Sequence, residues 1–179
     1  MKKIMGSAVL CLAIADAGVA YSQSFVKSSN DPFTGTWTLD FSKSRYIDEL
    51  KSRHSSPESK GPYGVKEEVV TLKVENNAEH CINDLTFEDG TRSQSEYTAT
   101  YNDAKWYPNT NLKTGKPTGG SVMMLRLEPT RELRISRNAD GTVASFVLRT
   151  VLEDGKTMRT VNTRAVDGVK ITDITLFKQ

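Results

Sequence analysis

The chain of 179 residues is divided by regularly spaced turn signals, and these constrain its fold more than any other feature. They lie at residues 87–91, 101–104, 138–142, 153–156 and 166–169, and four of the five contain an Asp-Gly step. Asp-Gly between segments of alternating apolar and polar residues is typical of tight β-hairpins, because the central positions of such turns require positive φ. The sequence therefore predicts consecutive antiparallel hairpins.

The segments between these turns have the alternation and the β-branched residues of β-strands. With one segment near the start, they make about nine strands, at residues 35–41, 67–74, 80–87, 95–101, 122–128, 133–137, 143–152, 158–165 and 171–177. Successive hairpins form a meander, and closing the meander into an up-and-down barrel removes its unpaired edges. No segment between strands has the pattern of a buried helix. We therefore expect an all-β, antiparallel up-and-down barrel of about eight to nine strands.

Two longer insertions interrupt this rhythm. Residues 42–64 begin with a possible helical turn and end in Ser, Pro and Gly, which predicts a loop. Residues 103–120 are polar and rich in Gly and Pro, with Trp106 and Tyr107 near their start. Long loops of a barrel often lie at its rim, where they can cap a cavity. The alternative is that both are solvated excursions without a role.

The start of the chain has the layout of a secretory signal peptide, with two lysines, an apolar run over residues 5–15 and then small residues. Cleavage after Ala20 and cleavage after Ser22 fit equally well. The apolar run is shorter than the roughly 20 residues that a transmembrane helix needs. We therefore expect a periplasmic or secreted protein, with a signal peptide at residues 1–22 and a single domain at residues 23–179.

The cysteines, histidines and charges limit the chemistry that we expect. Cys81 is the one cysteine of the predicted mature domain, so we expect no intramolecular disulfide and a buried thiol. His54 and His80 have no partner at metal-ligand spacing, and no catalytic or nucleotide-binding motif occurs, so no metal or cofactor is expected. The 24 basic and 22 acidic residues are scattered along the chain, which gives little support to nucleic acid or a membrane surface as partner.

Aromatic and charged residues of the predicted strands are the candidates for a ligand site. Tyr97, Ala99 and Tyr101 share one face, where they line a pocket or form core. Arg149 and Asp173 lie in strands whose alternation does not decide which face points inward. A charge inside the barrel must be paired, because an isolated buried charge is very costly. Candidates for such pairs are Arg126, Arg149, Arg159 and Arg164 among the bases, and Glu96 and Asp173 among the acids.

The start of the predicted domain resembles that of a known family. Gly35 and Trp37 form a GxW pattern that is similar to the first-strand signature of lipocalins. The whole segment 31–179 resembles a group of exported bacterial lipocalin-like proteins, on the matches DPF at 31–33, GTW at 35–37, Leu39, KS at 43–44, YNDAKWYP at 101–108 and DGKT at 154–157. The resemblance implies that Trp37 packs across the closed end of the barrel, covered by a basic residue such as Lys178. Most of that group has no assigned activity, so the resemblance implies fold and compartment more than function.

Three functions fit these observations. The first is a binding protein that holds a small, mainly hydrophobic ligand in the barrel, with Tyr97, Tyr101, Trp106, Tyr107, Arg149 and Asp173 as candidate ligand-binding residues. The second is a cofactor-free isomerase, cyclase or lyase, whose acid and base would come from His54, His80, Glu96, Tyr97, Tyr101 and Asp173. Its sign would be a His or carboxylate inside the barrel beside a Tyr or Arg. The third is an envelope interaction protein, whose barrel would be filled by Met123, Leu125, Leu127, Phe146 and Leu148.

Overall fold

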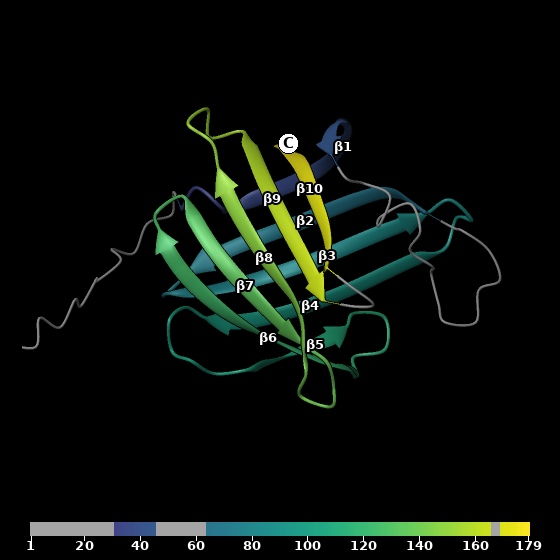
Figure 1. The fold of residues 1–179 in the computed structure, drawn as a ribbon, viewed down its shortest axis with the longest axis vertical. Helices are drawn as coiled ribbons and strands as arrows, with labels where there is room; N and C mark the ends of the chain where they lie inside the picture. Colours follow the sequence, from purple (N-terminus) through teal and green to yellow (C-terminus); the bar gives the residue numbers. More distant parts are fainter. Residues whose placement is uncertain (1–30, 46–63, 166–168) are drawn as a thin grey trace, which may run out of the picture.

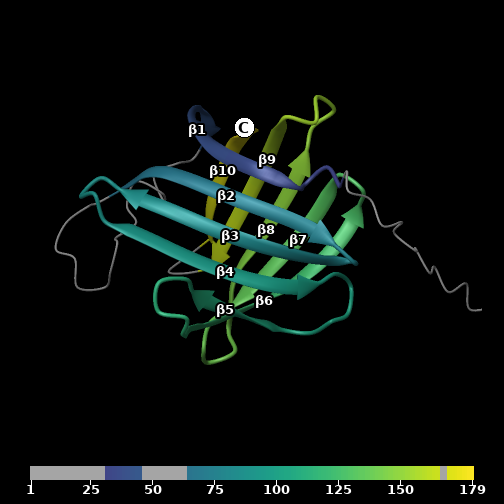
Figure 2. The same cartoon turned by 180° about the vertical axis from the view of Figure 1, so that it is seen from behind.

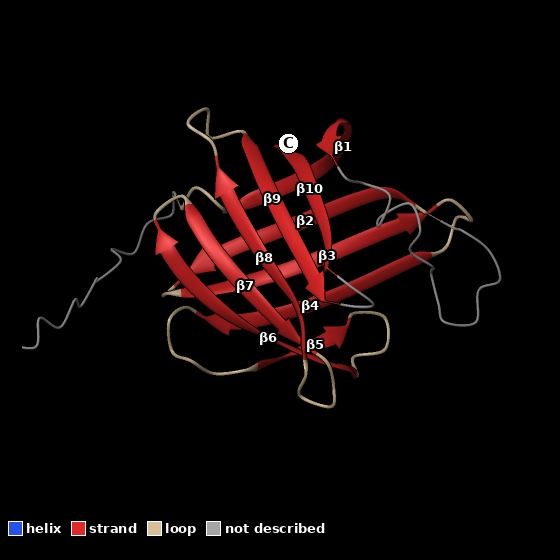
Figure 3. Ribbon diagram, viewed as in Figure 1, coloured by secondary structure: helices blue, strands red, loops and turns tan. Residues whose placement is uncertain are grey.

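The computed structural model describes residues 31–45, 64–165 and 169–179, and in these ranges it contains strands and no helix (Figures 1 and 3). The predicted signal peptide, the possible helical turn and His54 lie outside the described residues. The strands are β1 (Gly35–Arg45), β2 (Val65–Glu75), β3 (Ala78–Phe87), β4 (Arg92–Thr100), β5 (Tyr107–Asn111), β6 (Pro117–Glu128), β7 (Arg131–Arg137), β8 (Val143–Val151), β9 (Thr157–Ala165) and β10 (Val169–Lys178).

The strands pair in sequence order, and β1 also pairs with β10, so the sheet closes into an antiparallel up-and-down barrel. Figures 1 and 2 view it from opposite sides and show two walls, which we call the first wall (β1–β4) and the second wall (β6–β10), with β5 between them. The predicted all-β antiparallel barrel is confirmed. No helix in the part of the chain described here is long and apolar enough to cross a membrane.

The predicted number of eight to nine strands is wrong, because the described residues form ten. The strand that the sequence did not predict is β5, inside the segment 103–120 that was expected to be a loop. It pairs with β4 at two positions and with β6 through an irregular register. Its residues, YPNTN, show no apolar alternation. Backbone pairing alone makes it a strand, and hydrophobic patterning cannot detect such a strand.

The tight turns have the backbone that their residues favour. Gly90, Gly141 and Gly155 have φ of 80°, 85° and 62°, in three of the predicted Asp-Gly turns. A further turn joins β2 to β3 through Asn76 and Asn77, which have φ of 50° and 61°. Positive φ at both central positions is the requirement of a type I′ hairpin, and Asn tolerates it well. The fifth predicted turn, at 166–169, lies largely outside the described residues.

One end of the barrel is closed by the aromatic side chains at the start of the domain. Trp37 is fully buried, and its indole Nε1 donates a hydrogen bond of 2.8 Å to the Phe33 carbonyl. The Lys178 Nζ lies 5.2 Å from the centre of the Trp37 ring. A Cβ on Gly35 would lie 2.4 Å from the Lys178 Cε, and the Gly35 φ of 149° is one that residues with a side chain rarely adopt. Trp37, Lys178 and Gly35 thus form one packed unit.

The apolar interior is built from both walls, and Leu72, Met124, Met158 and Leu176 are each at most 1% exposed. Five residues expected inside a filled barrel have the opposite orientation, namely Met123, Leu125, Leu127, Phe146 and Leu148. Because side chains alternate along a strand, the burial of Val122 and Met124 on β6, and of Val147 and Arg149 on β8, places these five on the outer face.

Candidate functional site

Four charged side chains from β3, β6, β7 and β8 meet inside the barrel. Glu79 and Glu132 are fully buried, Arg149 is 4% exposed and Arg126 is 7% exposed. Each carboxylate stands close to a hairpin: Glu79 follows the Asn76–Asn77 turn, and Glu132 is the second residue of β7. We call these four residues, with Tyr97 and Tyr101, the charged cluster.

Arg149 is the centre of the charged cluster. Its Nη1 donates to Glu79 Oε1 at 3.0 Å and to Glu132 Oε1 at 2.8 Å. Its Nη2 donates to the Tyr97 hydroxyl oxygen at 3.2 Å. Breaking one partner of such a buried pair leaves an uncompensated charge, so the contacts stabilise the barrel only as a set.

The two tyrosine hydroxyls also form hydrogen bonds with the two carboxyl groups. The Tyr97 hydroxyl donates to Glu79 Oε1 at 2.6 Å. The Tyr101 oxygen lies 3.0 Å from Glu79 Oε2 and 2.8 Å from Glu132 Oε2. A hydroxyl has a single hydrogen, so Tyr101 can donate to one carboxyl group and must accept from the other. The geometry therefore accommodates a proton on one of the two carboxyl groups.

The electrostatics of the pair assign this proton to Glu132. Burial, and then the neighbouring charge of Glu79, raise the pKa of Glu132 to about 8. Burial also acts to raise the pKa of Glu79, but the Arg149 charge and the hydrogen bonds outweigh it and hold that pKa below its ordinary value. At neutral pH the pair therefore carries one proton and one negative charge, which Arg149 balances.

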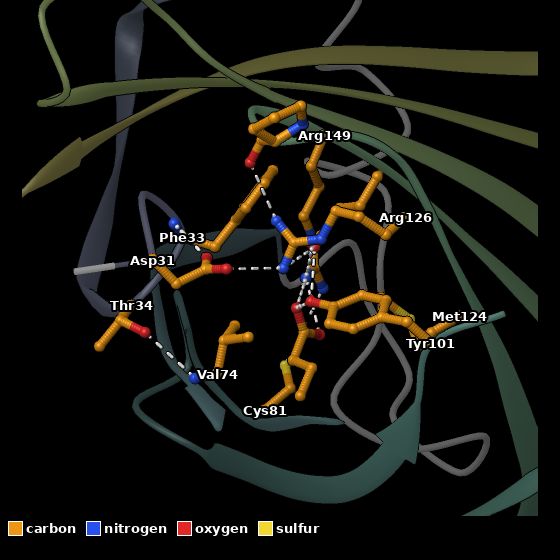
Figure 4. Close-up of polar contacts among 12 residues, drawn as sticks. Asp31, Phe33, Thr34, Val74, Cys81, Tyr101, Met124, Arg126 and Arg149 are labelled. Atoms are coloured by element: carbon orange, nitrogen blue, oxygen red, sulfur yellow. Dashed lines mark hydrogen bonds and ion pairs between the residues drawn. The ribbon is translucent and has the colours of Figure 1, made fainter. Parts of the chain in front are cut away.

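Arg126 links the charged cluster to the closed end of the barrel (Figure 4). Its guanidinium lies between two rings, 4.6 Å from the centre of Phe33 and 4.3 Å from the centre of Tyr101. Its Nη2 donates to Asp31 Oδ2 at 3.2 Å and lies 3.8 Å from Glu132 Oε2. Asp31 accordingly neutralises Arg126, and the segment before β1 is tied to β6 and β7.

Two cavities adjoin the charged cluster, and Arg126 lines neither. The larger has a volume of about 110 Å³ and is lined by Cys81, Asn83, Ser95, Tyr97, Asn109, Val122, Arg134 and Ser136. The smaller has a volume of about 30 Å³ and is lined by Glu68, Val70, Cys81, Asn83, Arg134, Val147, Arg149, Met158, Thr160, Ile174 and Leu176. Tyr97 of the charged cluster lines the larger cavity and Arg149 lines the smaller one.

Several residues that line these cavities carry a buried polar atom with no hydrogen-bond partner among the described residues. These atoms are the Oδ1 atoms of Asn83 and Asn109, the Nε of Arg134 and the Oγ1 of Thr160. Leaving a buried polar atom unsatisfied costs about 1–3 kcal/mol. Arg134 also makes no ion pair with any described carboxylate, and its guanidinium lies 5.9 Å from the centre of the Tyr97 ring. The residues of the cavity wall therefore carry unsatisfied hydrogen-bonding groups.

The structure brings together three of the six predicted ligand-binding residues: Tyr97, Tyr101 and Arg149 all belong to the charged cluster. Asp173 lies on the outside of β10, where its carboxylate accepts two hydrogen bonds from Arg159, at 2.9 and 2.6 Å. It does not join the interior group.

The two aromatic residues of the second insertion lie away from the charged cluster. The Arg137 guanidinium covers the Trp106 ring at 4.3 Å from its centre. The Tyr107 hydroxyl donates to Asp103. Neither aromatic residue lines either cavity.

The Cys81 and His80 side chains point to opposite sides of β3, as expected for neighbours on a strand. Cys81 is 1% exposed, which confirms the expected buried thiol, and burial raises its pKa above the ordinary value. His80 lies outside, with its Nε2 3.1 Å from Glu96 Oε2. No group of three or more His, Cys, Asp or Glu residues is placed to hold a metal ion within the described ranges.

The sequence reasoning missed Glu79, Glu132 and Arg134. Arg149 had a visible signal, because it lies between Val147 and Val151 on a face that must be buried. Glu132 had none: it follows a turn and alternates with apolar residues, which favours an outward carboxylate.

No protein-family model matches the chain, and no curated protein matches its sequence.

Proposed function

We propose that this protein binds a small polar molecule inside the barrel, between Arg134 and Tyr97. The observation that carries the proposal is the set of unpartnered polar atoms on residues that line the cavities, namely Asn83, Asn109, Arg134 and Thr160. Binding sites are concave and hold a few convergent polar groups, which is the arrangement found here. The lining favours a polar ligand in place of the mainly hydrophobic one expected from the sequence.

Size and charge narrow the ligand class. A cavity of about 110 Å³ has room for roughly four water-sized groups, at about 30 Å³ each. Arg134 supplies a planar cation that pairs well with a carboxylate, and the Asn oxygens accept from hydroxyl or amine groups. We infer that the ligand is a small carboxylate that also carries a hydrogen-bond donor.

The charged cluster forms the floor of this site. Tyr97 lines the larger cavity, and its hydroxyl is fixed between Glu79 and Arg149. Arg149 is held by both carboxyl groups while it lines the smaller cavity. Because these side chains are locked before a ligand arrives, binding loses little side-chain freedom.

The first test is native mass spectrometry of the protein purified from its own cells, compared with the denatured mass. We expect an added mass that is lost on denaturation. Calorimetric titration with acetate, lactate and glycine as probes then measures which group is recognised. A bare mass, together with no heat from any probe, would contradict the proposal.

A pair of variants of β7 locates the site. Arg134→Gln should weaken probe binding at least tenfold, because it removes the cation from the cavity. Arg137→Gln is the control, since Arg137 lies on the same strand but lines neither cavity. Equal binding by the two variants would place the ligand elsewhere.

A second candidate function is acid–base catalysis without a cofactor. Glu132, with a pKa of about 8, lies beside Tyr101 and Arg149, which is the combination expected of such an enzyme. Both carboxyl groups are nevertheless fully buried and line neither cavity, which favours binding over catalysis. If the purified ligand is converted on incubation, Glu132→Gln should abolish conversion while leaving ligand binding measurable.

We also propose that the chain is an exported member of the lipocalin-like proteins. Support comes from Trp37 under Lys178 at one end of the barrel and from the signal-peptide pattern of residues 1–22. Sequencing the amino terminus of the protein from a fractionated cell should give a start after Ala20 or Ser22 in the exported fraction. An intact amino terminus in the cytoplasm would contradict export.

A further inference from the structure

The outside of the second wall is covered by apolar side chains in two adjacent rows. Strand register aligns them across the wall as Met123, Ile135, Phe146 and Ile171 in one row, with the polar Thr163 between the last two, and as Leu125, Leu133, Leu148 and Val161 in the next row, which ends at Asp173 on β10. Leu127 lies on the same face of β6, two residues beyond Leu125 and next to the second row. We call these residues the apolar face.

The most exposed members of the apolar face are large. Phe146 is 45% exposed, Leu127 47% and Ile171 48%. Five strands about 4.8 Å apart, each contributing two same-face residues and so about 14 Å of length, give the apolar face an extent on the order of 300 Å². Scattered apolar residues are normal on a surface, but a contiguous face of this size marks an interaction site.

The charges around the apolar face are already paired and of both signs. At one end Arg131 donates to Glu128 at 3.2 Å, and Arg159 pairs with Asp173 at 2.6 Å. At the other end Arg137 is stacked on Trp106. An anionic membrane or a nucleic acid would require an excess of free basic groups. A surface with balanced charges is complementary to a second copy of itself.

We propose that two copies of this chain pack through their apolar faces, sheet against sheet, about a two-fold axis. One further residue on every side of the apolar face brings the contact to about 800 Å² per copy, the size of a standard stable interface. Phe146 lies on β8, the middle strand of β6–β10, so it is buried near the centre of the contact, where aromatic residues contribute most. The two barrel interiors stay separate.

Sedimentation velocity of the purified protein between 1 and 100 µM tests this. We expect a dimer, and Phe146→Glu should raise the dimer dissociation constant at least a hundredfold by burying two charges at the axis. Leu112→Glu is the matched control: Leu112 is 38% exposed and lies beyond β5, outside the apolar face. Both variants should keep the parent circular dichroism spectrum and melting temperature at concentrations where the parent is a monomer.

Three outcomes would overturn the proposal. A parent protein that stays monomeric at 100 µM has no such interface. A dimer that Phe146→Glu leaves intact uses another surface. A monomer that floats with vesicles of neutral and anionic phospholipid uses the apolar face on a membrane instead.

Discussion

The outer faces of the two walls differ, as β2 and β8 show. In β2, Val70 and Leu72 point inward and are buried, while Lys73 and Glu75 are exposed outside. On the second wall, Glu132 and Arg149 point inward and are at most 4% exposed, while Phe146 on the outside is 45% exposed. The alternation of residues along a strand therefore separates its two faces but does not show which face is inside. The closure of the barrel decides that.

The difference between the walls shows what the interior requires. Inward apolar side chains, such as Val70 and Leu72 on β2, need only a partner to pack against. A charged inner face needs hydrogen bonds for each charge, and here a residue from the first wall supplies some of them: Glu79 on β3 accepts from Arg149 on β8. The walls are thus joined by ion pairs as well as by apolar contacts.

The largest expected effect on stability comes from removing the cation of the Glu79–Arg149 ion pair. Arg149→Met should lower the free energy of unfolding by about 3–5 kcal/mol, because it leaves the Glu79 carboxylate buried without its counter-charge. Arg159→Met is the control, because the Arg159 side chain is 57% exposed and its pair with Asp173 contributes less than about 1 kcal/mol. Urea unfolding of both variants measures the difference. Equal losses would show that the buried pair does not join the walls.

The closed end provides the apolar counterpart. Trp37→Ala should cost roughly 3–5 kcal/mol, as truncation of a large buried aromatic side chain does. The loss should not depend on pH, because no carboxyl group contacts the indole in the described structure. A melting temperature within a few degrees of the parent would mean that Trp37 is not the packed base of the barrel.

Between pH 4.5 and 8, stability should depend on pH mainly through the charged cluster. The pKa of Glu132 is raised from 4.5 to about 8, so the folded protein keeps a proton that the unfolded chain loses above pH 4.5. The free energy of unfolding should therefore fall between pH 4.5 and 8, by up to about 1.4 kcal/mol per pH unit. Below pH 4.5 it should fall again, because the pKa of Glu79 is lowered.

Glu132→Gln isolates the alkaline part of this dependence. A neutral amide replaces the protonated acid, so the variant should be more stable than the parent at pH 8 and should show a flatter profile above pH 4.5. Glu128→Gln, with a side chain that is 55% exposed, should leave the profile unchanged. A parental slope in the Glu132 variant would assign the proton to another group.

The comparison of the walls also explains how far the sequence could be interpreted. The Asp-Gly turns predicted the hairpins and hence the closed barrel, because turn chemistry is local. The orientation of Phe146 and the partners of Arg149 could not be predicted, since both depend on strand register around the whole barrel. Glu79 and Glu132 are 53 positions apart in the numbering and meet only after closure. Tyr97 and Tyr101 were found because they share a strand face with Ala99, which is a local property.

The smallest expected effect separates the two tyrosines. Tyr97→Phe and Tyr101→Phe each remove a hydrogen bond to Glu79, so each should lower the free energy of unfolding by about 1–3 kcal/mol. Tyr97 also lines the larger cavity, whereas Tyr101 lines neither, so Tyr97→Phe alone should weaken binding of the carboxylate probes. Calorimetry on the two variants tests this directly, with urea unfolding as the reference for the structural loss. If both lose affinity equally, the tyrosines act on binding through the charged cluster as a unit, and the cavity contact of Tyr97 contributes nothing of its own. If affinity falls only in Tyr97→Phe, the Tyr97 hydroxyl contributes to ligand binding at the cavity. The rest of the charged cluster then contributes to stability and not to binding.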